Sequence, residues 1–175
     1  YAREHGLTVS YDPNLRRNLW SDEQTARQYI REGLNLCDVA KLSDEECTFL
    51  CGAGEIDALG HRLLAEHPNL KLLFVTCGAG GSYAFCGSRM AFVPGFSVKI
   101  ADTTGAGDAF VGAVLYQILR RGGLREAYSP AELEQLLTFG NAVGALSVQR
   151  YGAIPAIPTL AETESFLHAQ GLLGA

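Results

Sequence analysis

Residues 70–77 read Leu70-Lys71-Leu72-Leu73-Phe74-Val75-Thr76-Cys77, an almost unbroken apolar run that leads into the glycine-rich stretch 78–81. A strand with one face in water alternates apolar and polar residues, whereas a strand buried on both faces is apolar nearly throughout. The run therefore predicts a strand buried on both faces, as in a parallel sheet.

Outward from this run, the sequence alternates predicted strands and helices. Capping-box patterns, in which Ser or Thr precedes Glu or Gln by three residues, mark helix starts at Ser21, Ser43, Ser129 and Thr159. The predicted strands are 7–11, 38–42, 70–77, 82–86 and 89–93, and the predicted helices are 22–36, 44–52, 55–66, 106–121, 130–149 and one after Thr159. The last two strands are joined by a tight turn and should be antiparallel. This order predicts a layered α/β fold with a mostly parallel sheet.

The composition is that of a globular chain. Of its 175 residues, 47% are hydrophobic and 19% are charged, which excludes a disordered protein. The net charge of −5 argues against a nucleic-acid surface, and no basic run suggests a membrane surface. No apolar stretch reaches the roughly 18 residues of a transmembrane helix.

The cysteines indicate reduced thiols in an intracellular protein, because their number is odd and no C-x-x-C pair occurs. Cys47 and Cys51 should share a helix face, and no histidine lies near them in the sequence. We expect buried small side chains there rather than a metal site.

Residues 102–110, Asp-Thr-Thr-Gly-Ala-Gly-Asp-Ala-Phe, are the strongest candidate for chemistry. Gly105 and Gly107 fall where a loop enters a helix, so an anion could approach the unpaired N–H groups at the positive end of the helix dipole. Asp108, in the same first turn, could accept a proton from an alcohol held nearby. An anion cradle beside a base is what phosphoryl transfer to a hydroxyl requires. The alternative is a flexible loop before a helix whose Asp108 only offsets the dipole.

Two other phosphate-binding motifs are excluded by this stretch. A Walker loop needs a lysine that is missing here, and Phe110 stands where the dinucleotide fingerprint G-x-G-x-x-G needs its third glycine.

Residues 102–110 closely resemble the C-terminal signature of the PfkB (ribokinase-like) sugar kinases, and four further segments match this family in order. They are Asp12-Pro13-Asn14-Leu15-Arg16 with Leu19-Trp20, similar to the D-P-N-x-R…L-W of fructokinase-type members; Lys41 to Glu46, similar to K-x-S-x-E-E; Val75 to Gly81, similar to V-T-x-G-x-x-G; and Asn141-Ala142 with Gly152 to Pro155. The resemblance covers nearly all 175 residues. It implies a three-layer ribokinase-like fold with a mostly parallel sheet and the ATP-dependent phosphorylation of a sugar.

The resemblance implies a role for each matching residue. Asp108 would be the base that deprotonates the sugar hydroxyl, and Gly105, Ala106 and Gly107 would form the anion hole. The other implied roles are nucleotide binding by Thr76, Gly78, Gly81 and Asn141, substrate or phosphate contact by Asn14 and Arg16, Mg²⁺ binding through water by Glu46, and binding of a monovalent cation such as K⁺ by backbone carbonyls of Asp102, Thr104, Val148, Tyr151 and Ala153.

Several of these residues also have a purely structural interpretation. Glu46 fits a plain capping box with Ser43, and the two roles can coexist. The stretch 78–81 could be only a turn, and 12–16 a turn with a solvated arginine. Asn141 lies among small residues and could support close helix packing. The four histidines match no motif and are expected on the surface.

The resemblance further implies that residues 1–175 are the C-terminal, nucleotide-binding portion of the kinase, without its N-terminal strands, its lid and most of its sugar contacts. The parent enzyme is expected to be a cytoplasmic homodimer that binds a sugar and ATP, with no nucleic-acid or membrane partner. Fructose is the expected substrate. The alternatives are a 2-keto-3-deoxygluconate kinase and a non-catalytic nucleotide-binding fragment. The isolated chain is expected to be inactive, because positioning of the acceptor dominates phosphoryl transfer.

Overall fold

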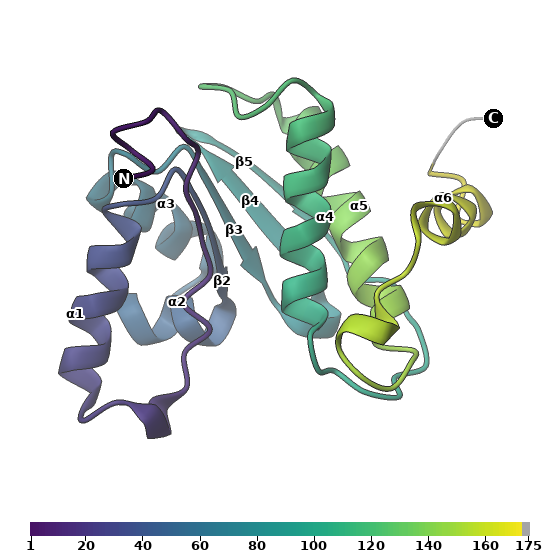
Figure 1. Cartoon of the computed structure of the whole chain (residues 1–175), viewed down its shortest axis with the longest axis horizontal. Coiled ribbons are helices and arrows are strands. Elements are labelled where there is room, and N and C mark those ends of the chain that lie inside the picture. The colour runs from purple at the N-terminus through teal and green to yellow at the C-terminus, as the bar shows by residue number, and fades with distance from the viewer. Residues whose placement is uncertain (173–175) are drawn as a thin grey trace. The chain divides into compact units, whose positions relative to one another are not determined.

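The computed structural model describes residues 1–172, which fold into two compact units. The first unit comprises Tyr1–Cys77, Tyr83–Ala91 and Arg125–Leu133. The second comprises Gly78–Ser82, Phe92–Leu124 and the described residues from Glu134 onward. Figure 1 labels the α-helices and the strands β2, β3, β4 and β5.

Five strands form one sheet in the order β1-β2-β3-β4-β5. They are β1 (Ser10–Tyr11), β2 (Val39–Ser43), β3 (Leu72–Thr76), β4 (Ser82–Cys86) and β5 (Arg89–Val93). The first three run parallel, with Tyr11 opposite Ala40 and Ser43 opposite Thr76. Only two residues, Gly87 and Ser88, connect β4 to β5, and so short a connection makes an antiparallel hairpin. The predicted parallel strands and hairpin are therefore confirmed.

The first strand is shorter than predicted, because only two of the residues 7–11 pair as a strand. The N–H of Val9 donates instead to the Asp38 carboxylate (2.9 Å). The Val9 carbonyl accepts from both Asp38 and Val39 (2.8 and 3.1 Å). A side chain thus takes the place of a ladder partner at this end of β1.

Three helices belong to the first unit: α1 (Glu23–Leu34), α2 (Asp44–Cys51) and α3 (Ile56–Glu66). The capping box of Ser43 and Glu46 at α2 is confirmed. The capping box predicted from Ser21 is wrong, because Asp22 caps α1 by accepting the N–H of Thr25 (2.8 Å). The Ser21 hydroxyl donates to the Asp22 carboxylate (3.0 Å) instead. A carboxylate is the stronger acceptor, so the helix begins one residue later.

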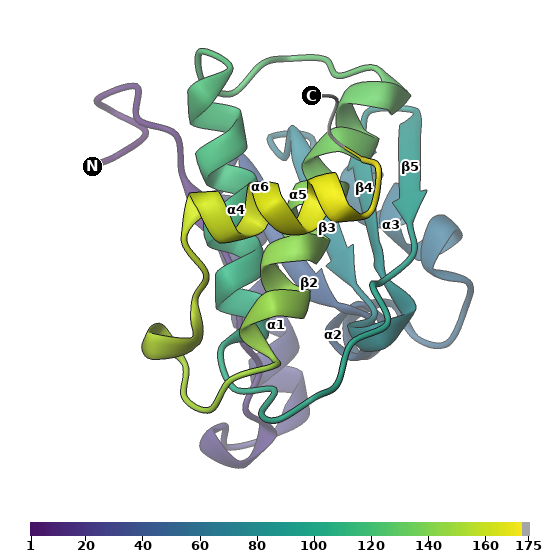
Figure 2. The same cartoon turned by 90° about the vertical axis from the view of Figure 1, so that its right-hand side faces the viewer.

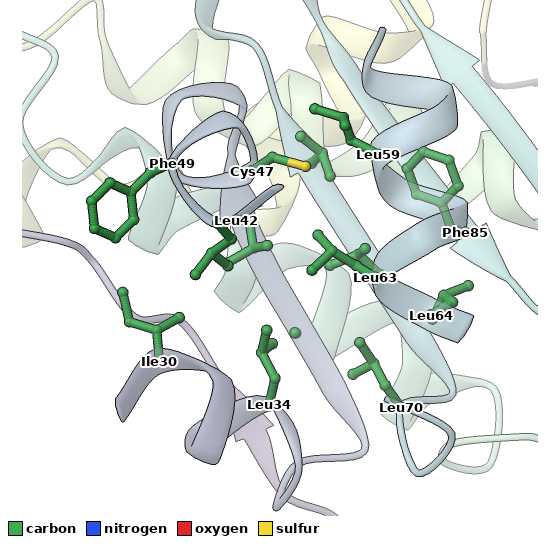
Figure 3. Packing of buried hydrophobic residues seen from close by; sticks show 14 of the residues in the cluster. Ile30, Leu34, Leu42, Cys47, Phe49, Leu59, Leu63, Leu64, Leu70 and Phe85 are labelled. Atoms are coloured by element: carbon green, nitrogen blue, oxygen red, sulfur yellow. The ribbon is translucent and has the colours of Figure 1, made fainter. Parts of the chain in front are cut away.

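The core of the first unit lies between these helices and one face of the sheet. Leu42 and Leu63 are fully buried there together with Ile30 and Leu34 of α1, as Figure 3 shows. A Cβ at Gly60 would lie 2.3 Å from the Phe85 ring, so α3 packs its backbone directly against that ring. Each fully buried aliphatic side chain contributes about 1.5–3 kcal/mol, and this cluster accordingly fixes the parallel strands.

The second unit is built from α4 (Ala106–Arg120), α5 (Pro130–Ser147), whose first turn lies in the first unit, and α6 (Leu160–Ala169). Ala109 of α4, Ala142 of α5 and Leu167 of α6 belong to one buried cluster. Figure 2 shows α6 crossing α4 and α5 in agreement with these contacts. A Cβ at Gly140 would lie 2.7 Å from the Phe110 ring, so this glycine allows α4 and α5 to approach closely.

The expectation for the histidines is wrong at His67, which is 3% exposed. Its Nδ1 donates to Oδ1 of Asn35 (2.6 Å), and its Nε2 is buried without a hydrogen-bond partner. Burial lowers the pKa of His67, and the nearby Arg31 guanidinium lowers it further. The imidazole is therefore held neutral inside the first unit.

The cysteines are free thiols. Cys47 is fully buried on α2, as expected, whereas Cys51, the last residue of the same helix, is only half-buried. Between residues 1 and 172, none of the helices combines the length and the apolar character needed to cross a membrane.

Candidate active site

In the first unit, three candidate segments follow the carboxyl ends of neighbouring parallel strands. Asp12 comes directly after β1, Ser43 ends β2 and Thr76 ends β3. Ser43 and Thr76 are register partners, so they are neighbours across the sheet. Open α/β sheets bind their ligands at this edge, because the connections that leave it carry the polar side chains and helix N-termini.

Glu46 is the most buried charged residue of this edge, at 6% exposure. One carboxylate oxygen accepts the N–H of Ser43 (2.7 Å) and completes the capping box of α2. The other accepts the N–H of Leu15 (2.6 Å), a contact that the sequence did not reveal. Glu46 therefore joins the start of α2 to the segment that carries Asn14 and Arg16.

The segment 12–16 is held by an ion pair that sequence reasoning missed. Asp12 accepts from Nζ of Lys41 (3.3 Å), and both side chains are largely buried. The other Asp12 oxygen accepts the N–H of Asn14 (3.1 Å), which has a φ of +46°. Burial raises the pKa of Asp12, while Lys41 opposes that shift. Asn14 and Arg16 are exposed.

In the second unit, residues 78–81 form a tight turn that packs against the backbone of residues 93–95. Gly78 and Gly81 have φ values of +55° and +112°. A Cβ at Gly81 would lie 2.2 Å from the Val93 carbonyl oxygen, and one at Gly95 would lie 2.5 Å from the Ala79 carbonyl oxygen. A Cβ at Gly78 would meet nothing within 4 Å, so the turn is closed on one side and open at Gly78.

Asn141 of α5 lies at this same turn. Its Nδ2 donates to the carbonyls of Val93 and Pro94 (3.1 and 3.3 Å), and its Oδ1 accepts from the Ser82 hydroxyl (2.7 Å). The structure thus brings Asn141 together with Gly78 and Gly81. Ser82, which is fully buried, joins this group without having been predicted.

The stretch 102–108 begins with a carboxylate that organises the loop. Asp102 accepts the N–H and the hydroxyl of Thr104 (2.9 and 2.7 Å) and, through its other oxygen, the N–H of Gly152 (3.0 Å). These hydrogen bonds, that from the Thr104 N–H first, lower the pKa of Asp102. A Cβ at Gly105 would lie 2.9 Å from the Ala153 Cβ, so the loop packs tightly against the chain near residue 153.

Helix α4 starts from this loop without a side-chain cap. Its N-cap is Gly105, at a φ of +78°, and Ala106 and Gly107 follow it. The helices α1, α2 and α6 each have a side-chain acceptor at this position. Asp108 lies in the first turn of α4 and is exposed. A positive helix end therefore stands beside a carboxylate, as the sequence predicted.

The carbonyls suggested for a monovalent cation lie in two segments that the structure joins. The Val148 carbonyl accepts from the N–H groups of Ala101 and Asp102 (2.7 and 3.2 Å). The Ala153 carbonyl accepts from Ala156 (3.1 Å), and Tyr151 is 81% exposed. Of these carbonyls, that of Val148 already has two donors. Within residues 1–172, no three His, Cys, Asp or Glu side chains gather as a metal-binding group.

The comparisons with known proteins decide the family. The model of the pfkB family of carbohydrate kinases matches residues 1–160. The chain belongs to the pfkB family of carbohydrate kinases. Fructokinase-2 of Solanum lycopersicum is 43% identical over 166 residues, which are 95% of this chain and 50% of that relative. The chain thus spans about half the length of the curated relatives it matches.

Solved structures show the same family fold. The fructokinase of Xylella fastidiosa with bound ATP matches 97% of this chain and 54% of its own, with a TM-score of 0.85 and 35% identity. A double mutant of the fructokinase of Vibrio cholerae O395, with fructose, ADP and potassium bound, matches 95% of this chain and 52% of its own, with a TM-score of 0.82 and 36% identity. The expected ribokinase-like α/β fold of this pfkB chain is therefore confirmed.

Proposed function

We propose that this chain is the nucleotide-binding portion of a sugar kinase that transfers the terminal phosphoryl group of ATP to a hydroxyl of fructose. The observation that supports this most directly is the start of α4, where an uncapped helix end, a glycine N-cap and Asp108 occur together. This chain matches half the length of two fructokinases, and this similarity favours fructose as the acceptor.

In this proposal, Asp108 accepts the proton of the sugar hydroxyl as that oxygen attacks phosphorus. The backbone N–H groups of Gly105, Ala106 and Gly107 stabilise the negative charge that develops on the transferred group. Thr76, Gly78, Gly81 and Asn141 form the nucleotide site, and Asn14 and Arg16 contact the substrate or the phosphate.

Mg²⁺ and K⁺ belong to the same proposal. The Glu46 carboxylate fits an indirect role in Mg²⁺ binding, since each oxygen accepts one N–H and keeps a further lone pair for water. Bound Mg²⁺ would neutralise phosphate charge. Asp102, Thr104, Tyr151 and Ala153 offer carbonyl oxygens of the kind that bind K⁺, and Val148 fits less well because two N–H groups already occupy its oxygen.

Calorimetry and a coupled assay with the purified 175-residue chain test the proposal. We expect binding of ADP, because the proposed nucleotide residues all lie in this chain. We expect no fructose-dependent release of ADP, because misplacing an acceptor by about 1 Å costs roughly 10²-fold and much of the relatives' length is not matched. A folded chain that binds no nucleotide would refute the nucleotide site. Robust turnover with fructose would show that the sugar contacts lie within residues 1–175.

A further inference from the structure

The glycine turn 78–81 is locked onto residues 93–95 by contacts that tolerate no side chain. A Cβ added at Gly81 would lie 2.2 Å from the Val93 carbonyl oxygen. The Ala79 carbonyl oxygen lies 2.5 Å from the place of a Cβ at Gly95. Two backbone segments therefore touch each other directly, and any shift of residues 93–95 shifts the turn.

One amide group holds both segments. Nδ2 of Asn141 uses its two hydrogens on the carbonyls of Val93 and Pro94, and Oδ1 accepts from Ser82, the residue that follows the turn. We call Asn141, Ser82, Val93 and Pro94 the Asn141 clamp. The carbonyl held by Asn141 is the same one that Gly81 packs against. Only an amide of this length offers two donors and one acceptor from a single planar group.

The clamp leaves little of the Asn141 side chain for a ligand. Both amide hydrogens and one lone pair of the oxygen are already in hydrogen bonds within the second unit. The turn itself is open at Gly78, where the space for a Cβ is empty to 4 Å. A ligand can therefore approach the backbone at Gly78, whereas the Asn141 amide faces protein.

We infer that Asn141 is a positioning residue, which sets nucleotide affinity through the turn 78–81 and the phosphate groups rather than by reading the adenine base. The inference rests on the proposed function, because it assumes that the turn binds a nucleotide. It distinguishes two ways in which the same residue could matter. A direct contact to the base would depend on the base, whereas a displaced turn weakens any ligand that carries the phosphate chain.

The test compares ADP with inorganic tripolyphosphate, which has the phosphates but no base. Asn141→Leu removes the hydrogen bonds to Val93, Pro94 and Ser82, whereas Ser82→Ala removes only the one that Asn141 accepts. Gln135→Leu is a matched amide-to-apolar control at an exposed position of α5. Calorimetry at a temperature where each variant is folded gives the dissociation constants. A purely structural role would lower the competent fraction of the protein and leave the dissociation constant unchanged.

We expect Asn141→Leu to weaken the binding of ADP and of tripolyphosphate by the same factor, on the order of tenfold, because the hydrogen bonds that fix the turn are lost. Ser82→Ala should weaken both several-fold and equally, and Gln135→Leu should change neither. Because Asn141→Leu and Ser82→Ala act through one turn, the double variant should bind each ligand no more weakly than Asn141→Leu alone.

Three results with the variants, and one with the wild-type chain, would overturn the inference. Weaker binding of ADP with unchanged binding of tripolyphosphate would mean that Asn141 contacts the base, and the proposed nucleotide site would stand. Additive effects of the two substitutions would mean that they act independently. Unchanged binding in folded Ser82→Ala and Asn141→Leu would show that the clamp does not influence the ligand. If the folded wild-type chain binds neither probe, the proposed nucleotide site itself fails and the inference falls with it.

Discussion

Replacing Gly81 by alanine should destabilise the chain far more than the same change at Gly78, three residues earlier. At Gly81 the added Cβ would lie 2.2 Å from the Val93 carbonyl oxygen and 2.7 Å from both the Gly95 nitrogen and the Pro94 Cα. These are backbone atoms, so no side-chain rotation relieves the overlap. The φ of +112° also lies outside the left-handed helical region that alanine tolerates best.

The expected magnitude follows from two contributions. An unfavourable backbone conformation costs about 1–3 kcal/mol, and forcing atoms into a filled space costs about 1–3 kcal/mol more. Gly78 shares only the first contribution, since its φ of +55° is left-handed helical and a Cβ there meets nothing within 4 Å. We expect about 1 kcal/mol for Gly78→Ala and about 3 kcal/mol or more for Gly81→Ala.

Urea unfolding followed by far-ultraviolet circular dichroism measures the difference. With a slope of about 2 kcal/mol per molar urea, the two variants should unfold roughly 1 M apart. Affinity for ADP should fall more for Gly81→Ala if the turn carries the phosphates. Equal urea midpoints for the two variants would refute the argument from backbone contact.

Three further predictions concern single charged or titratable groups. In the proposed full-length sugar kinase, Asp108→Asn should lower phosphoryl transfer by on the order of 10²–10⁴-fold while ATP affinity, measured by calorimetry, stays nearly constant; a normal kcat would contradict its assignment as the base. Glu46→Gln should cost about 1–3 kcal/mol in urea unfolding, because a Gln amide cannot accept both the Ser43 and the Leu15 N–H groups, whereas Glu45→Gln on the exposed side of the same turn should cost little. The pKa of His67 is lowered in the folded state, so the unfolded chain takes up a proton first as the pH falls below the ordinary value of 6.5; stability should drop through this range, and a His67→Leu variant should lack that drop.

The sequence predicted most helices and strands because their local signals agree with the tertiary contacts. The hairpin 82–93 and the capping box of Ser43 and Glu46 lie where they were expected. The Ser21 capping box failed for a local reason, because the adjacent Asp22 caps α1. The other two errors arose where a distant residue competes with a local signal. The Asp38 carboxylate, which lies outside the predicted strand 7–11, accepts the N–H of Val9. Asn35 gives the buried His67 a hydrogen-bond partner.

The candidate site was predictable in its residue types and not in its connections. The glycines and Asp108 of 102–108 predict an anion cradle, and the structure places them at the start of α4. The Asp12–Lys41 ion pair joins residues 29 positions apart in the chain, and the hydrogen bond from Leu15 to Glu46 joins residues 31 positions apart. No local pattern reports such contacts.

By itself, the sequence determined the α/β order of elements and the candidate residues for phosphate binding, because hydrophobic period, caps and glycine spacing are local properties of the chain. Its resemblance to the pfkB family rests on whole motifs, which are also local. Only the tertiary structure decided what those residues do for one another. Asn141 is one amide among small residues in the sequence, yet in the fold it holds Ser82, 59 positions away, and the Val93 carbonyl that Gly81 packs against. A hydrogen bond depends on the distance and direction between two groups, and folding alone sets both.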